Sequence, residues 1–131
     1  MIGLILVAHA GLARELLAAA EMILGEIEHA EAVGISPDDK VEVIHGAISG
    51  AMLKVGQDGA IIMTDMFGGT PSNMGLSFLD ENRVEVLTGV NLPMIIKFAS
   101  DRNKCSVAEL AESLKKCGCE GITVAGDYLK K

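Results

Sequence analysis

Apolar runs alternate with segments of helical spacing along the 131-residue chain. Residues 2–8 are continuously apolar, which is typical of a strand buried on both faces of a sheet. The following segment repeats Leu12, Leu16 and Leu17 at helical spacing and predicts a helix over 11–24. Further strands are predicted at 29–35, 59–64 and 84–88, with a short apolar stretch at 122–125.

Proline and capping residues mark the starts of the other predicted helices. Ser36 is expected to cap a helix that reaches about residue 55, with Pro37 in its first turn. Thr70 and Pro71 predict the next helix start in the same manner. Two more helices are predicted, one opening at Pro93 after Asn91 or Leu92 and one at the capping box of Ser106 and Glu109.

Strands that alternate with helices indicate βαβ units, a parallel sheet and right-handed crossovers. We therefore expect one doubly wound α/β domain over residues 1–131, with a mainly parallel sheet in 2-1-3-4 order. The stretch 122–125 is short and terminal, so it predicts an edge strand of either direction.

This strand order predicts where a site would form. In open α/β sheets, ligands bind outside the carboxyl ends of the strands, where the strand order reverses. In 2-1-3-4 order that point lies between the first and third strands. His9 leaves the first strand and Asp65 leaves the third, so the topology predicts that both lie at one crevice.

The residues after Asp65 add features of an anion site. Gly68 and Gly69 allow a close-approaching backbone, and they lead into a helix start whose free N–H groups favour an anion. Thr70 and Ser72 offer hydroxyl groups. Together with a nucleophilic imidazole and a carboxylate to orient it, these residues indicate phosphoryl chemistry. Each also has a plain structural interpretation, as a hydrogen-bonding histidine, a tight turn or a helix cap.

Other chemistries find no support in the sequence. It contains no P-loop, no Rossmann glycine spacing and no metal-ligand cluster, and Cys117 and Cys119 lack partners to complete a metal site. The formal net charge of −7 opposes non-specific nucleic-acid binding. No apolar run approaches ~20 residues, so no membrane insertion is expected. Without a secretion signal, and with an odd number of cysteines, we expect reduced thiols and a cytoplasmic protein.

Three motifs follow the predicted strands in order: VAHAG at 7–11, DMFGGTP at 65–71 and GVNLPM at 89–94. Over essentially the whole chain, the sequence resembles the enzyme IIA component (EIIA) of the mannose class of the bacterial phosphoenolpyruvate-dependent sugar phosphotransferase system (PTS). The resemblance implies a phosphocarrier that receives a phosphoryl group from phospho-HPr and passes it to a IIB component. The membrane components IIC and IID would take part indirectly, and no metal or organic cofactor is used.

The resemblance also assigns roles to residues of the predicted crevice. It implies that His9 is the phosphorylated nucleophile and that Asp65 orients its ring. Gly68, Gly69 and Thr70 would bind the phosphoryl group, with threonine keeping the hydroxyl of the serine that many members have.

An apolar rim is expected beside these residues. Met66, Phe67 and Met94 are candidates for partner docking, and the alternative is that they belong to the core. Phe67 stands where the family often has tryptophan, a departure that should affect packing more than chemistry.

Family members are usually homodimers in which the C-terminal strand pairs with the partner subunit, which fits the stretch at 122–125. Three other functions stay open at this point. The chain could be a regulatory phosphoprotein uncoupled from transport, a phosphotransfer subunit for dihydroxyacetone kinase, or a flavodoxin-like ligand-binding module that is never phosphorylated.

Overall fold

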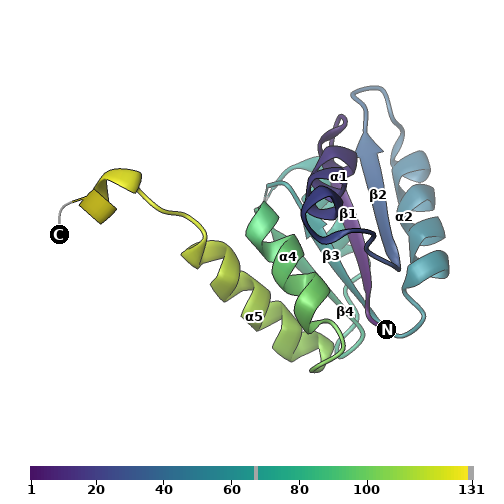
Figure 1. Ribbon diagram of the computed structural model, residues 1–131. Coiled ribbons are helices and arrows are strands. Elements are labelled where there is room, and N and C mark those ends of the chain that lie inside the picture. Colours follow the sequence, from purple (N-terminus) through teal and green to yellow (C-terminus); the bar gives the residue numbers. More distant parts are fainter. Residues whose placement is uncertain (67, 130–131) are drawn as a thin grey trace.

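A four-stranded, all-parallel sheet forms the centre of the computed structural model, which describes residues 1–66 and 68–129 (Figure 1). Its order is β2-β1-β3-β4, which confirms the predicted α/β class and strand order. The strands are β1 (Gly3–His9), β2 (Ala30–Ile35), β3 (Ala60–Thr64) and β4 (Val84–Thr88). The helices are α1 (Leu12–Leu24), α2 (Val41–Val55), α3 (Thr70–Leu76), α4 (Leu92–Asp101), α5 (Val107–Glu120) and the short 3₁₀ helix η1 (Ala125–Leu129).

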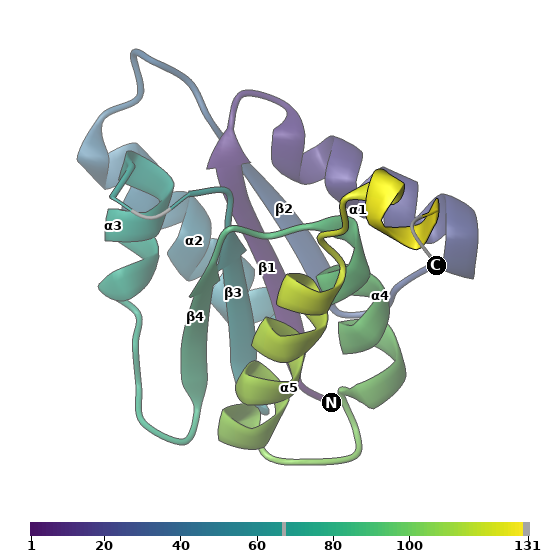
Figure 2. The same ribbon diagram turned by 90° about the vertical axis from the view of Figure 1, so that its left-hand side faces the viewer.

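The continuous apolar run of β1 is explained by helices on both faces of the sheet (Figure 2). Leu4 and Leu6 point to one face, where they pack with buried residues of α1, α4 and α5, including Phe98. Ile5 and Val7 point to the other face and pack against the buried side of α2. Since both faces are covered, no polar side chain interrupts the strand before its end at His9.

Arg102 holds the amino end of the sheet, opposite the carboxyl ends of the strands. Arg102 is 5% exposed, and its guanidinium donates to the carbonyl oxygens of Ile2, Glu28 and His29 at 2.6–3.1 Å. It also lies 4.7 Å above the ring of Phe98. These bonds join the start of β1 to the loop before β2, so the two strands begin in a fixed relation.

Two predicted helix caps are displaced, the first by four residues and the second by one. Helix α2 begins at Val41 after Lys40 instead of being capped by Ser36, because Asp39 Oδ2 accepts the Ser36 N–H at 2.8 Å and closes a separate turn. Helix α3 is capped by Gly69, and Thr70 is its first residue, so the Thr70 hydroxyl is not used as a cap. The capping box of Ser106 and Glu109 on α5 is confirmed.

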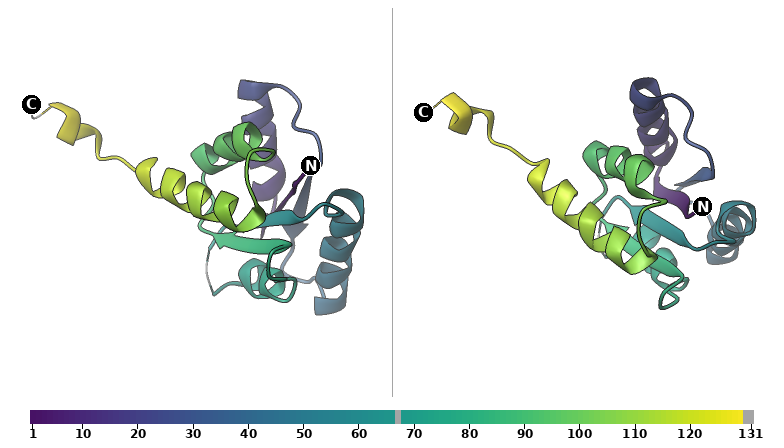
Figure 3. Two further views of the ribbon diagram at one scale, coloured as in Figure 1. Left: turned by 90° about the horizontal axis from the view of Figure 1, so that it is seen from below. Right: turned by 60° about the horizontal axis from the view of Figure 1, so that its bottom comes forward.

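The predicted strand at 122–125 is not formed within one chain. After α5 the chain runs away from the sheet and ends in η1 (Figures 1 and 3), and all described residues from 121 to 129 are exposed. No strand edge among the described residues lies beside this segment, so within the described chain it has no partner for a β ladder. Among the described residues, no helix is long and apolar enough to span a bilayer.

Candidate functional site

His9 and Asp65 meet at the carboxyl ends of β1 and β3, as the strand order predicts. Asp65 Oδ2 lies 2.7 Å from His9 Nδ1 and also accepts the backbone N–H of His9 at 3.0 Å. Asp65 Oδ1 accepts the N–H of Met66 at 3.0 Å. The carboxylate is therefore fixed by two backbone donors, and it holds the imidazole ring through one nitrogen.

The two side chains differ in exposure. Asp65 is 13% exposed, whereas the ring of His9 is 50% exposed. Burial raises the pKa of Asp65, but the bonds from the His9 backbone, the His9 ring and Met66 outweigh it, so the pKa lies below its ordinary value. Asp65 is thus held as a carboxylate, and the ring it orients faces solvent.

The backbone turns sharply directly after His9. Ala10 has a φ of 52°, a left-handed conformation that is unfavourable for a residue with a Cβ. Its N–H donates to the Ile35 carbonyl of β2 at 2.8 Å. The Ala10 carbonyl oxygen packs so closely on Gly34 that a Cβ there would lie 2.5 Å from it. The end of β2 therefore fixes the turn that projects His9 from the sheet.

A second turn approaches His9 from the β3 side. We call residues 68–70 the glycine turn. Gly68 has a φ of 86°, and a Cβ on Gly69 would lie 3.3 Å from His9 Cε1. The N–H of Gly68 donates to the buried Ser72 Oγ at 3.4 Å. Glycine at 68 allows the positive φ of the turn, and glycine at 69 lets the backbone pass close to the imidazole ring.

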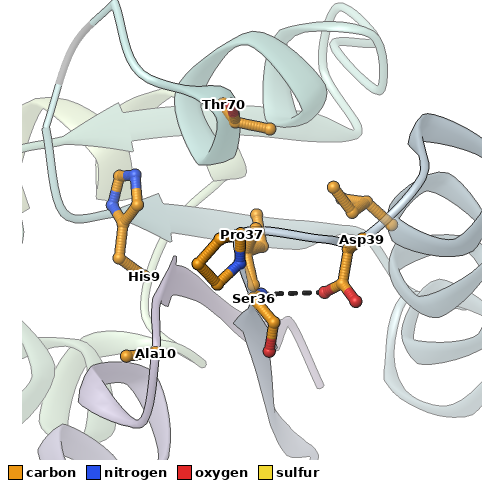
Figure 4. A pocket seen from close by; sticks show the side chains of 8 residues that line it. His9, Ala10, Ser36, Pro37, Asp39 and Thr70 are labelled. Carbon is orange, nitrogen blue, oxygen red and sulfur yellow. Dashed lines mark hydrogen bonds between the residues drawn. The ribbon is translucent and has the colours of Figure 1, made fainter.

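A cavity of about 380 Å³ opens beside the His9 ring (Figure 4). Thr70 lines it from the glycine turn, and Ser36, Pro37 and Asp39 line it from the loop after β2. Its walls are completed by Ala10, Ile35 and Ile44. The cavity can therefore admit a small group or a side chain next to His9.

The structure places the remaining predicted site residues in different surroundings. Met66 is 56% exposed beside Asp65, whereas Met94 is 3% exposed in the core and packs tightly on Gly118 of α5. Met94 thus exposes almost no surface to a partner. It is a core residue, which was the alternative expectation. Phe67 lies outside the described residues. Within the described part of the chain, no three His, Cys, Asp or Glu side chains are grouped to hold a metal ion.

Sequence reasoning missed the contribution of β2 to the site. Gly34 and the loop residues Ser36 and Asp39 were not expected there. One signal was present, because β2 lies next to β1 in the predicted order and its carboxyl end must reach the same edge of the sheet.

Comparison with known proteins identifies the family. Residues 3–115 match the EIIA-man family, described as "PTS system fructose IIA component". The chain is 32% identical over 114 residues to the sorbose-specific EIIA component of Lacticaseibacillus casei, covering 86% of this chain and 83% of the relative. It is 27% identical over 133 residues to the fructose-specific EIIA component of Bacillus subtilis (strain 168), covering 100% and 91%.

A solved structure agrees with these matches. The mannose/sorbose-specific IIA subunit from Enterococcus faecalis superposes with a TM-score of 0.84 and 29% identity, covering 94% of this chain and 93% of that one. The fold and its matches define a sugar phosphotransferase component. More particularly, the chain belongs to the mannose-class EIIA family of the PTS.

Replacing Gly34 by alanine should destabilise the turn after His9. The new Cβ would meet the Ala10 carbonyl oxygen at 2.5 Å, and backbone atoms cannot move aside cheaply. We expect Gly34→Ala to lower the free energy of unfolding by about 1–3 kcal/mol, as in other overpacked sites. Chemical denaturation measures it. Gly46→Ala is the control, because its Cβ position in α2 meets no atom within 4 Å apart from its chain neighbours and the backbone of its own helix, and it should raise stability by about 0.5–1 kcal/mol. Equal effects would contradict this account.

Replacing Asp65 by asparagine should change how stability depends on pH. The folded-state pKa of Asp65 is lowered, so its contribution is fully present above the ordinary carboxyl pKa of about 3.9 and is lost as pH falls through the lower value. We expect Asp65→Asn to be less stable than the parent at neutral pH, with the difference shrinking below about pH 4. Chemical denaturation between about pH 2 and 7 tests this expectation. Asp38→Asn is the control, because it removes the same charge from an exposed loop. A pH-independent difference would refute the assignment.

Proposed function

We propose that this chain is a phosphocarrier of sugar uptake that takes a phosphoryl group from phospho-HPr onto His9 and passes it to a IIB component. One observation carries the proposal: the His9 ring is half exposed and is held at Nδ1 by the Asp65 carboxylate at 2.7 Å. A carboxylate accepts only a protonated ring nitrogen, so Nδ1 carries the hydrogen in the neutral ring. The lone pair then resides on Nε2, which becomes the nucleophile.

Phosphoryl transfer to Nε2 needs few groups besides the ring and its carboxylate. The lone pair of Nε2 forms a bond to phosphorus while the bond between phosphorus and the donor breaks, and the donor atom keeps that electron pair. Nδ1 keeps its proton, so the phosphorylated ring is positively charged and its charge is balanced by Asp65. Fixing the ring before the donor arrives lowers the entropic part of the barrier.

The glycine turn is proposed to bind the phosphoryl oxygens. Gly69 lies against Cε1, the atom bonded to Nε2, so a phosphoryl group on Nε2 would lie next to Gly68 and Gly69. Thr70 lines the same cavity and is proposed to contribute its hydroxyl. The exposed side chain of Met66, together with Phe67, is proposed to contact the partner proteins.

The names of the relatives support a role in sugar phosphotransfer, which is the general part of this proposal. Both EIIA relatives are named for sugars, and a mannose-specific EIIAB component of Escherichia coli (strain K12) matches over 92% of this chain and 38% of that protein. A IIA component exchanges phosphoryl groups with other PTS proteins, so we propose that residues 1–131 act as one such domain in the cytoplasm. The IIC and IID components would then be engaged only through IIB.

His9→Ala should abolish phosphorylation. With phosphoenolpyruvate, enzyme I and HPr, we expect the parent chain to acquire an acid-labile, alkali-stable label, because the N–P bond of a phosphohistidine is hydrolysed in acid and resists alkali. Radiolabelled phosphate transfer followed by gel analysis measures it, and the variant should retain less than about 1% of the label.

His45→Ala is the matched control. His45 lies in α2 and stacks on Phe78 with ring centroids 4.7 Å apart, so it makes a packing contact, and it is not among the residues that line the cavity. It should keep full labelling. Label on His9→Ala at the parent level would rule out the proposed nucleophile.

We further propose a homodimer in which residues 122–125 pair with the other subunit as an exchanged edge strand. Ile122 and Val124 are 76% and 67% exposed, and Leu129 beyond them is 87% exposed. Strand β4 lies at the edge of the sheet, so its outer side has no strand partner within the described chain. Exposed apolar side chains and an open sheet edge are both covered if two chains exchange these segments.

Charges on this segment should therefore break the dimer. We expect Ile122→Asp combined with Val124→Asp to sediment as a monomer where the parent sediments as a dimer, because buried carboxylates are costly. Analytical ultracentrifugation at micromolar concentration measures it. Leu53→Asp is the control, since Leu53 is 77% exposed on α2, on the opposite face of the sheet from α5. A dimer that survives the double substitution, or a monomeric parent, would contradict the exchange.

A further inference from the structure

Two hydroxyl side chains are fully buried beneath the glycine turn. Ser72 in the first turn of α3 and Thr64 at the end of β3 are both 0% exposed. Ser72 Oγ accepts the N–H of Gly68, but Thr64 Oγ1 has no hydrogen-bond partner among the described residues. A buried hydroxyl without a partner costs folding free energy, so its retention directly before Asp65 needs an explanation.

The two hydroxyl residues lie on facing surfaces. Ser72 and Gly75 belong to the buried face of α3, three residues apart. A Cβ on Gly75 would lie 3.5 Å from the methyl group of Thr64, which places this face of α3 directly over the end of β3. Thr64 and Ser72 therefore belong to one small packed region between β3 and α3.

Ser72 accepts a hydrogen bond from the backbone N–H of Gly68, which the proposed function assigns to the phosphoryl group. Gly68 directly precedes Gly69, whose Cβ position lies 3.3 Å from His9 Cε1. In the proposed function, the N–H of Gly68 is one of the donors to the phosphoryl group. In the unphosphorylated protein this N–H is already donated to Ser72 Oγ. At 3.4 Å the bond is long, and such bonds are weak and easily exchanged.

We infer that Ser72 is a positioning residue with two hydrogen-bond states, and that Thr64 is its second partner. While His9 is unphosphorylated, Ser72 holds the N–H of Gly68. When a phosphoryl oxygen accepts that N–H, the Ser72 hydroxyl turns to Thr64 Oγ1, which then gains the partner it lacks. This inference rests on the proposed function, and it involves no covalent change at either hydroxyl.

A double-mutant cycle tests the inference. Radiolabelled phospho-HPr, freed of enzyme I, is mixed with each variant, and the label is measured in both proteins at equilibrium. Thr64→Val, which keeps the shape of the side chain, should shift the equilibrium toward phospho-HPr by about two- to tenfold, the value of one net hydrogen bond. In a Ser72→Ala background the same substitution should have no effect, because Thr64 acts only through Ser72.

Two further measurements separate this mechanism from a general packing role. Thr64→Val should raise the stability of the unphosphorylated protein, because it removes the unpartnered hydroxyl. In the parent, the amide proton of Gly68 should shift in NMR spectra on phosphorylation, a readout that needs no variant. Thr88→Val and Ser77→Ala are matched controls, at a half-buried strand end and an exposed helix end, and both should leave the equilibrium unchanged.

The outcomes distinguish the two proposals. Equal shifts by Thr64→Val in both backgrounds, or no shift in either, would overturn the role of Ser72 and Thr64 while leaving His9 phosphorylation intact. An unchanged Gly68 amide on phosphorylation would do the same. A parent chain that takes no label from phospho-HPr would overturn this inference together with the proposed function.

Discussion

A single carboxylate oxygen joins the two central strands at the carboxyl end of the sheet. Asp65 Oδ2 accepts both the backbone N–H of His9 and the ring nitrogen Nδ1, at 3.0 and 2.7 Å. The backbone bond fixes where β1 ends relative to β3, and the ring bond fixes how the imidazole projects from that end. Because the same atom makes both bonds, the position of the strand and the orientation of the ring cannot vary independently.

The loops on either side of this carboxylate carry the remaining constraints, and they do so mainly through backbone atoms. On one side the Ala10 carbonyl packs against Gly34, and on the other the backbone of Gly69 passes His9 Cε1. A Cβ on Gly34 would clash with the Ala10 carbonyl oxygen at 2.5 Å, and a Cβ on Gly69 would crowd the His9 ring at 3.3 Å. The site therefore depends on close backbone approach at both of its edges, and side chains add only the ring, its carboxylate and a few hydroxyls.

The sequence was sufficient to predict those features that follow from topology. Continuous apolar strands and intervening helices determine a parallel sheet, and its strand order brings His9 and Asp65 together. Features that depend on local competition were not predictable in this way. Asp39 accepts the Ser36 N–H, and this local bond displaces the start of α2. Met94 could belong to the rim or to the core by its sequence position, and only its packing against Gly118 of α5 shows that it belongs to the core. The stretch 122–125 has the composition of a strand, but pairing requires a sheet edge that its own chain does not present to it.

The scarcity of strong contacts around His9 is consistent with a carrier. Among the described residues that line the cavity, none is lysine or arginine, whereas Asp39 and the nearby Asp65 are acidic. A fixed cation would bind the phosphoryl group tightly and would lower the free energy of the phosphorylated carrier. Backbone N–H groups and hydroxyls bind an anion more weakly than a charged side chain does. In the proposed role, the free energy of the phosphorylated carrier therefore stays high enough for onward transfer. The strong, permanent interaction of the site is the one between the Asp65 carboxylate and the His9 ring.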